Sequence, residues 1–561
     1  MFDDLVAEGY SLAQRNWQLT SVVASLLPFV LTYLVTSLRA FLAANNKSDS
    51  RSAPIAPYAV PFFGNLFSFL NNNERTIRNA LFVPTLVTSK HARDVPVRFR
   101  LANRKLTLIS GTANVLAMFR GSRYLDSTEI IIITVDNAFG GAAAGNECYA
   151  HDDTGSRKDP LPGSRPLNMS DRIWYLQHKT VHTNLVGPPL VEIAERFVQY
   201  MGEELDRAIP ASETDWVDVP DFYGLIQSTI FAASTNAIYG PHLIRLSPSI
   251  NKDFWEYDHH VPTLFKLVPR LFAPKAYAVR DRLLAAIKKW QAHALANLDL
   301  NDPKLEGVAW EEFYGSKLMR DRAVDFIGVK GMTDQLRPTF DIGLLWAANA
   351  NIVPTVGWCL IDILTRPNLA ATSIYAEELR LRNAMLIQRT PIVDTFKIGP
   401  WKFPKGDMIM ASSWQEARNR ETWNQRGRDG EEHDVEDFWA ERFLVYKDDP
   451  LSGPRLIDAA KVKGGEEAKK TEGGEAAPPK FAPEKVAGQF IPYGGGENIC
   501  PGRFYAKQEA MAGMALFLTK FEIELQLEPG RVLEPNKKQF GFGVMGPTGA
   551  IKARMRRRKV E

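Results

Sequence analysis

The sequence predicts a mainly α-helical protein with small β-sheets and one N-terminal transmembrane helix. Residues 16–38 contain no charge, and residues 186–330 carry amphipathic helical patterns broken at prolines. Residues 95–110 and 395–410 alternate apolar and polar side chains around turns, as the strands of small sheets do. With 561 residues, 45% of them apolar, the chain can form one large fold or about two to four average domains.

The uncharged run Asn16–Leu38 has 23 residues, enough to cross a hydrocarbon core of about 30 Å as a helix. A cleaved signal peptide is disfavoured because the run is long and acidic residues precede it; a buried helix is the other alternative. Three basic residues follow the run and one precedes it, which predicts that the bulk of the chain is cytosolic. Residues 1–15 are then a short N-terminal segment, and residues 39–65 a basic, proline-rich hinge.

Charge and cysteine content exclude several classes of protein. The net charge is only +3, from 68 basic and 65 acidic residues, so nucleic-acid binding is not predicted. Cys148, Cys359 and Cys500 are too few and too scattered for a disulfide framework or a zinc knuckle. A reducing, cytosol-facing compartment fits this cysteine usage.

The most informative stretch is FIPYGGGENICPGRFYAK, residues 490–507, with Cys500 at its centre. Three glycines precede the cysteine and let a flat ligand approach the backbone closely. The cysteine also stands just before a predicted helix, where free N–H groups favour a thiolate. These features suit a soft metal ligand, although a turn with a buried cysteine has the same spacing.

The segment YGGGENICPGR resembles the heme-binding loop of the cytochrome P-450 superfamily, with Tyr493, Gly496, Cys500 and Gly502 in its four characteristic positions. The resemblance implies the P-450 fold, with Cys500 as the axial ligand of heme b iron. Asn498 stands where the superfamily usually has Arg or His against a heme propionate. Asn can donate a hydrogen bond but carries no charge, so part of the propionate clamp must come from elsewhere.

A second helix-like segment, residues 171–187, places Trp174 and His178 four residues apart on one face. The superfamily uses a Trp and a following basic residue on its third helix to bind a propionate. The resemblance therefore makes Trp174, His178 and Lys179 candidates for that contact. His178 and His182 form an HxxxH pair, but with no third ligand nearby a zinc site is not predicted.

The segment EELRL places Glu377 and Arg380 at i, i+3, a pair that contributes only about 0.2–1 kcal/mol when it is on a surface. In the superfamily the equivalent ExxR pair is buried and is completed by an Arg from a later loop. FWAERF, residues 438–443, resembles that loop with Ala440 in place of Pro, which makes Arg442 the third member. The ExxR pair, the FWAERF segment and the Cys500 loop follow one another along the chain in the order that the superfamily has.

Residues 340–358, FDIGLLWAANANIVPTVGW, predict a long buried helix with small residues beside a ligand. The superfamily's central helix normally carries an acid followed by Thr here, and this chain has Ala350 and Asn351. The LWAxxAN pattern followed by Pro354 resembles the subgroup of sterol 7α-hydroxylases and prostacyclin synthase. Asn351 cannot titrate, so it is no general acid; it can bond to oxygen or water, or satisfy a carbonyl freed by Pro354.

Other stretches bear on domain organisation. Only ten positions separate Pro367 from Glu377, where the superfamily has most of a helix and a second short helix. Either a tight connection replaces them or a faulty gene model has lost them. We favour the latter, and a lost helix is expected to loosen the Glu377–Arg380 pair.

Asp258 and the two histidines after it are interpreted as surface residues. The remaining boundaries are a monooxygenase domain at 66–552, a disordered insert at 453–487 and a basic tail at 553–561.

The predicted function is monooxygenation of a lipophilic molecule by a fungal-type microsomal member of the superfamily. The resemblance implies NADPH-cytochrome reductase as a partner, with cytochrome b5 as a second candidate, and a single-pass location in the endoplasmic reticulum membrane. Ala350-Asn351 leaves open a heme-thiolate isomerase that needs no reductant. The short connection before Glu377 leaves open a heme-binding protein with impaired catalysis.

Overall fold

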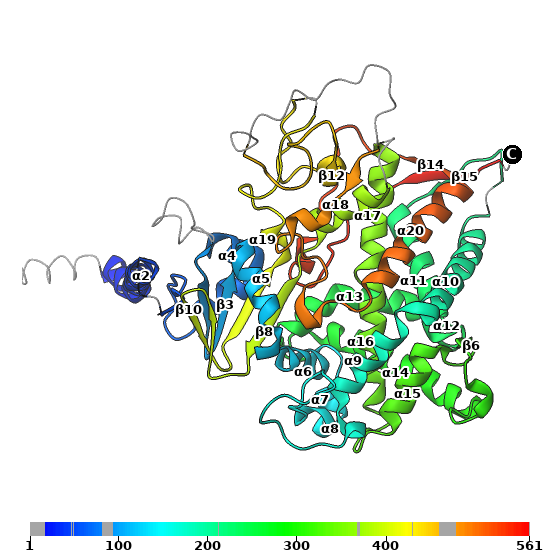
Figure 1. The fold of residues 1–561 in the computed structure, drawn as a ribbon, viewed down its shortest axis with the longest axis horizontal. Helices are drawn as coiled ribbons and strands as arrows, with labels where there is room; N and C mark the ends of the chain where they lie inside the picture. Colours follow the sequence, from blue (N-terminus) through cyan, green and yellow to red (C-terminus); the bar gives the residue numbers. More distant parts are fainter. Residues whose placement is uncertain are drawn as a thin grey trace, which may run out of the picture. The chain divides into compact units, whose positions relative to one another are not determined.

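The computed structural model describes residues 17–45, 48, 50–80, 94–210, 212–366, 371–428, 430–458 and 478–559 (Figure 1). The chain divides into two compact units. The first comprises Met1–Leu125 and Ile387–Ser412, and the second comprises Asp126–Leu386 and Ser413–Glu561.

The first unit contains most of the β-structure. Its five-stranded sheet has the order β2-β3-β11-β8-β4, and a three-stranded sheet has the order β1-β10-β9. The predicted strand pairs are present: β2 and β3 are antiparallel, as are β9 and β10, which turn at Gly399-Pro400. The elements are α2 (Trp17–Ala44), β1 (Arg51–Ser52), α3 (Leu66–Asn71), α4 (Asn73–Ala80), β2 (Val97–Leu101), β3 (Arg104–Ile109), α5 (Thr112–Arg120), β4 (Leu125–Asp126), β8 (Leu386–Pro391), β9 (Thr395–Ile398), β10 (Trp401–Pro404) and β11 (Met408–Ser412).

The N-terminal apolar helix is longer than predicted. Helix α2 continues to Ala44, so residues 39–44 are helical and do not belong to a hinge. Its stretch Ser21–Ala44 is long and apolar enough to cross a membrane, and none of its most apolar window is buried. The Thr36 hydroxyl donates to the Tyr58 carbonyl at 3.0 Å, which ties the proline-rich segment to the end of this helix. A second apolar stretch, Arg337–Thr365, is 72% buried, as is typical of core helices.

The second unit is mainly helical. Its helices are α6 (Thr128–Asn137), α7 (Gly141–Ala144), α8 (Glu147–Ala150), α9 (Ile173–Asn184), α10 (Gly187–Ala208), α11 (Phe222–Tyr239), α12 (His242–Leu246), α13 (Ile250–Phe265), α14 (Pro274–Asn297), α15 (Lys317–Ile327), α16 (Arg337–Asn349), α17 (Ile352–Thr365), α18 (Ala371–Arg382), α19 (Ser413–Glu416) and α20 (Arg503–Lys520). Its strands are β5 (Val217–Val219), β6 (Trp310–Glu311), β7 (Gly315–Ser316), β12 (Leu444–Val445), β13 (Lys480–Phe481), β14 (Phe521–Leu525) and β15 (Ala553–Arg557).

Side-chain spacing explains how these helices pack. Helix α10 starts with prolines in its first turn and buries Leu190, Ile193, Phe197, Met201 and Leu205, spaced three or four apart on one face. Helix α11, which it contacts, is buried at nearly every position from Thr229 to Tyr239. Helices α17 and α20 pack against these two at the centre of the unit (Figure 1).

The predicted long buried helix is two helices that meet at Ala350 and Asn351. Helix α16 ends at Asn349 and α17 begins at Ile352. Pro354 accounts for the break, because its ring clashes with the carbonyl of the residue four positions earlier, which is Ala350. The candidate residues Ala350 and Asn351 therefore lie at a backbone interruption.

Two predicted boundaries are wrong. Residues 478–487 are folded: β13 pairs with β12, and Val486 is buried with Trp423 and Phe443 in a small core. The central part of the predicted insert, residues 459–477, lies outside the described residues. The predicted basic tail contains β15, whose arginines pair with Glu522, Glu524 and Asp206. This part of the tail is folded because β15 pairs with β14 and β5.

Candidate active site

Cys500 lies three residues before α20, on a loop closed by its own N–H, which donates to the Tyr493 carbonyl at 3.0 Å. Gly494 and Gly496 have φ of 72° and 69°, a left-handed conformation that glycine adopts without strain. The Cys500 side chain is exposed, whereas the other two cysteines are buried or half-buried. The loop thus presents the one exposed cysteine.

The protein alone does not favour a Cys500 thiolate. Desolvation by the surrounding chain raises the pKa of the thiol, and the N–H groups of Gly502 and Arg503 with the Arg503 charge offset only part of this. The expected lowering by the start of α20 is therefore outweighed. Gly502 has an ordinary φ of −76°, and an added Cβ would meet nothing nearer than 3.7 Å. The chain's own packing does not require glycine there, whereas a flat ligand against the Cys500 sulfur would.

Tyr493 is held by a second tyrosine behind the loop. Its hydroxyl and that of Tyr375, on α18, are 2.5 Å apart and share a hydrogen bond. Burial raises the pKa of Tyr493 to about 12, so it stays neutral near physiological pH. The contact links the Cys500 loop directly to the helix that carries Glu377 and Arg380.

An arginine that sequence reasoning missed lies beside the Cys500 loop. Arg157 forms an ion pair with Glu497, and Asn498 is 3.4 Å from the hydroxyls of Ser127 and Ser156. Arg157 comes from the glycine- and proline-rich stretch for which no conformation could be predicted. Arg157 thus reaches the residue before Asn498, where its charge is paired with Glu497.

Buried Arg172 holds this stretch in place. Its guanidinium donates to the Thr154 hydroxyl at 3.0 Å and to the carbonyls of Lys158 and Arg157 at 2.5 Å. Because Arg172 directly precedes α9, the loop is fixed to the start of that helix. No sequence signal distinguishes Arg172 or Arg157 from the other basic residues of this region.

The three α9 candidates have different environments. The indole N–H of Trp174 donates to the Asp152 carbonyl at 3.0 Å, and its ring is buried beside Tyr149. Lys179 is exposed and pairs with Asp325 at 3.3 Å. His178 differs, because its buried Nε2 has no hydrogen-bond partner within the described part of the chain. Burial and neighbouring His182 lower the pKa of His178 to about 4.

Glu377, Arg380 and Arg442 form a buried cluster in which every side chain has zero exposed area. The Arg380 guanidinium binds Glu377 with two hydrogen bonds of 2.7 and 2.8 Å, and Arg442 approaches the same carboxylate at 3.4 Å. Burial alone would raise the pKa of Glu377, but the two arginines outweigh it and the pKa is lowered.

The short connection does not loosen this cluster, contrary to expectation. Arg380 also donates to the carbonyls of Ala417 and Val435 at 2.9 and 2.6 Å, and Trp439 N–H donates to Glu377 at 2.9 Å. These anchors lie in segments after the connection, so they do not depend on it. Helix α18 packs directly on α17. Residues 367–370 of the connection itself lie outside the described residues.

Asn351 is tied to the C-terminal segment. Its Oδ1 accepts the N–H of buried Val544 at 3.0 Å, and its carbonyl accepts the Thr355 hydroxyl at 2.7 Å. The amide therefore satisfies a backbone donor of another segment. The predicted alternative was that the Asn351 amide satisfies a carbonyl freed by Pro354. The contact with Val544 is a different one, because the amide oxygen accepts a backbone N–H.

We expect Asn351→Ala to lower the free energy of unfolding by about 1–3 kcal/mol, because the buried Val544 N–H loses its acceptor. Asn351→Asp keeps an acceptor oxygen at the same position and should recover most of the loss. Denaturant unfolding of the detergent-solubilised proteins measures both. An Asn351→Ala protein as stable as wild type would show that the contact contributes nothing.

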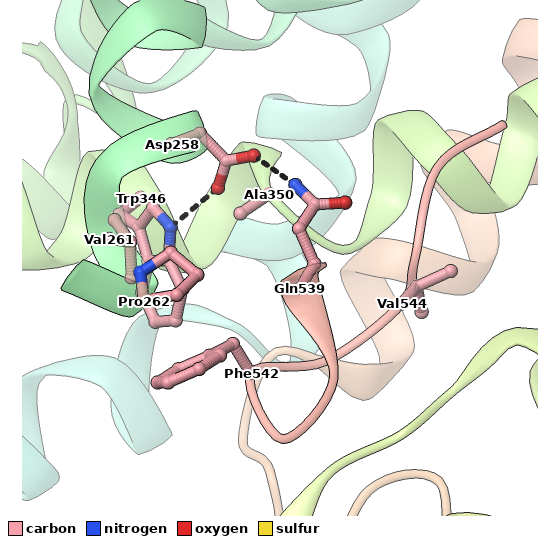
Figure 2. Close-up of a pocket in the computed structure, with 8 residues that line it drawn as sticks. All are labelled: Asp258, Val261, Pro262, Trp346, Ala350, Gln539, Phe542 and Val544. Carbon is pink, nitrogen blue, oxygen red and sulfur yellow. Dashed lines mark hydrogen bonds between the residues drawn. The ribbon is translucent and has the colours of Figure 1, made fainter. Parts of the chain in front are cut away.

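Asp258 is buried, which corrects its interpretation as a surface residue. Only 7% of the residue is exposed, and its carboxylate accepts the Trp346 indole N–H at 2.9 Å and the Gln539 amide N–H at 2.7 Å. Figure 2 shows it on the wall of a pocket that Ala350 also lines. Its burial was missed because both partners come from segments distant in sequence.

Comparison with known proteins decides the family. No family model matches the chain. The cytochrome P450 monooxygenase efuG of Hormonema carpetanum is 31% identical to it, over 98% of each chain. The chain belongs to the cytochrome P450 monooxygenases. Monooxygenase fsoE of Humicola fuscoatra is 30% identical over 99% of this P450 and 94% of the relative. A 5-beta-cholestane-3-alpha,7-alpha-diol 12-alpha-hydroxylase of Sus scrofa is 25% identical over 41% of this P450.

Family membership confirms the predicted fold class and enzyme class, and it implies a heme-thiolate cofactor, a redox partner and a lipophilic substrate. The residues present fit such a cofactor: an exposed sulfur, room at Gly502, and the unpartnered Nε2 of His178. The alignments with efuG and fsoE extend over 592 and 597 positions, more than the 561 residues of this P450. At least 31 positions of efuG therefore face gaps in this chain (592 − 561).

Proposed function

We propose that this P450 inserts one atom of dioxygen into a C–H bond of a sterol, terpenoid or other secondary metabolite. The second oxygen atom leaves as water, with two electrons from NADPH and two protons. The observation that carries this proposal is the full-length similarity to fungal monooxygenases, in a chain whose one exposed cysteine lies on the Gly-rich loop. An NADPH-cytochrome reductase would supply the electrons, with cytochrome b5 as a possible second donor.

We propose heme b as the cofactor and Cys500 as its axial ligand. A thiolate-bound heme iron supplies activation of dioxygen toward O–O cleavage. Tyr493 would orient the loop, and Gly496 and Gly502 would leave room for the ring. The buried cluster of Glu377, Arg380 and Arg442 would hold the loop's surroundings rigid.

For the propionates we favour His178, whose Nε2 has no partner among the described residues, with Arg157 and Asn498 beside the loop. Trp174 and Lys179 remain proposed contacts, although their polar groups are bonded to Asp152 and Asp325 in the protein alone. Neither Ala350 nor Asn351 can release a proton near neutral pH, so any proton must arrive through water or another group.

We further propose that α2 anchors the enzyme in the endoplasmic reticulum membrane by a single pass, with residues 66–552 and the strand after them forming the cytosolic domain. Its exposed apolar surface and the basic residues that follow support this orientation.

The test is a ferrous-CO difference spectrum of membranes containing the full chain, followed by turnover of lipophilic substrates. We expect a red-shifted, thiolate-type Soret band and product formation that requires both NADPH and reductase. Turnover without NADPH would instead identify the isomerase that Ala350-Asn351 left open. A thiolate band with no turnover of any kind would indicate impaired catalysis, and the absence of the band would contradict the proposal.

We propose that the short Pro367–Glu377 connection reflects residues lost from the gene model. The gaps that this chain shows opposite efuG support the loss of residues. Sequencing the transcript across these codons tests it: intervening codons are expected, and restoring them should raise the yield of heme-loaded protein. A transcript that matches the present sequence would show the tight connection to be genuine.

A further inference from the structure

Asp258 places a carboxylate in a small pocket, which the Gln539 amide, the Trp346 indole and apolar side chains also line. The pocket has a cavity of about 10 Å³, which is the room that one water molecule or one hydroxyl group needs. Its apolar walls come from α13 and from the C-terminal segment, namely Val261, Pro262, Phe542 and Val544 (Figure 2). The cavity itself therefore has room for one small polar group, next to apolar walls.

The carboxylate is fixed in position from two sides. One oxygen accepts the Trp346 indole N–H at 2.9 Å and the other accepts the Gln539 amide N–H at 2.7 Å. Figure 2 shows the two donors on separate segments, with the carboxylate between them. Each carboxylate oxygen can accept a further hydrogen bond. The group that joins them must therefore be a donor, an O–H or N–H, and cannot be an ether, ester or ketone.

Charge supports the same conclusion. Burial raises the pKa of Asp258 to about 6, and the two hydrogen bonds act in the opposite direction. Above that pH the side chain is mainly a carboxylate, the form that accepts hydrogen bonds. Ala350 lines the same pocket. A group bound at Asp258 would thus lie beside the interruption between α16 and α17.

We propose that Asp258, held by Trp346 and Gln539, anchors a hydroxyl group of an otherwise apolar substrate and so determines which substrates this P450 accepts. The inference rests on the proposed function, because it assumes that a lipophilic substrate enters next to Ala350. It narrows the substrate class to lipophilic alcohols, and it assigns recognition to one carboxylate on α13.

The test uses two probes of equal chain length, dodecanol and its methyl ether, titrated into the full-length, heme-loaded protein. Binding is read from the shift of the ferric Soret band. Wild type should bind the alcohol about tenfold more tightly than the ether, the effect of one hydrogen bond to a charged group. Asp258→Asn should reduce this ratio severalfold, and Asp258→Leu should bring it close to one.

Glu256→Gln is the matched control, because Glu256 is an exposed acid on the same helix that pairs with Arg282. It should leave the ratio unchanged. The proposal would be overturned if wild type bound the two probes equally, if it bound neither, or if Asp258→Leu kept the preference for the alcohol. Equal affinities would mean that the cavity holds only water. If Asp258→Asn and Asp258→Leu both lose the heme, the ratio of the two affinities in wild type alone tests the proposal. Absence of a thiolate-type band in wild type contradicts the proposed function instead.

Discussion

A Cys500→Ala protein is expected to give no thiolate-type Soret band and to lose all NADPH-dependent turnover. Cys500 is the one cysteine with an exposed side chain, and its loop is closed by the hydrogen bond to Tyr493. Removing the sulfur leaves the described loop without a soft donor for iron. The ferrous-CO difference spectrum of the variant in membranes measures the loss directly.

The control is Cys148→Ser, because Cys148 is half-buried and burial raises the pKa of its thiol to about 11. This variant should keep the thiolate band, since Cys148 lies on α8 and not on the Gly-rich loop that carries Cys500. Cys500→Ser tests whether oxygen can substitute, and it should bind heme without the thiolate-type shift. An unchanged spectrum in Cys500→Ala would refute the assignment of the ligand.

The second large effect is expected at the buried charge cluster. Glu377→Gln should lower the free energy of unfolding by about 3–5 kcal/mol, because it leaves Arg380 and Arg442 buried without a counter-charge. At that cost much of the protein should fail to fold or to retain heme. Thermal unfolding of the solubilised protein and the yield of the CO complex measure the loss.

The neighbouring residue offers a matched control. Glu378 is equally buried on α18, but burial and nearby Asp362 raise its pKa well above the ordinary value. Burial therefore favours the neutral form of Glu378, which has one arginine partner, Arg382 at 3.3 Å, and Glu378→Gln should change stability less than Glu377→Gln does. Equal losses in the two variants would mean that packing, and not charge, is what Glu377 contributes.

The pH dependence has a defined sign. The folded-state pKa of Glu377 is lowered, so its contribution is fully present above the ordinary value of 4.5 and is lost as pH falls through the folded-state pKa. The difference in stability between wild type and Glu377→Gln should therefore shrink in acid. Unfolding midpoints of both proteins at several pH values check this. A difference that grows in acid would contradict the ionised state of Glu377.

Much of the candidate site could be predicted from sequence because its chemistry is local. Cys500 and its glycines lie within one loop, and Glu377 and Arg380 lie one helical turn apart. Spacing and residue type were sufficient at these positions. The break at Ala350 was not predicted, although Pro354, four residues later, accounts for it.

The boundaries of several segments, and the contacts between segments distant in sequence, could be found only from the folded structure. The ends of the predicted insert and the basic tail are strands because distant segments pair with them, and short charged sequences carry no sign of that pairing. The cluster around Glu377 survives the short connection because its anchors come from segments about 40 to 60 residues further along the chain.

The family, the Cys500 loop, the Glu377–Arg380 pair and the apolar N-terminal helix could all be predicted from sequence, since each depends on residues close together along the chain. The folded structure was needed to show that Arg157 pairs with Glu497 and that Asp258 lines a pocket. Gln539 is 281 residues from Asp258. Burial of a charged side chain is set by which segments cover it, and that information is distributed over the whole fold.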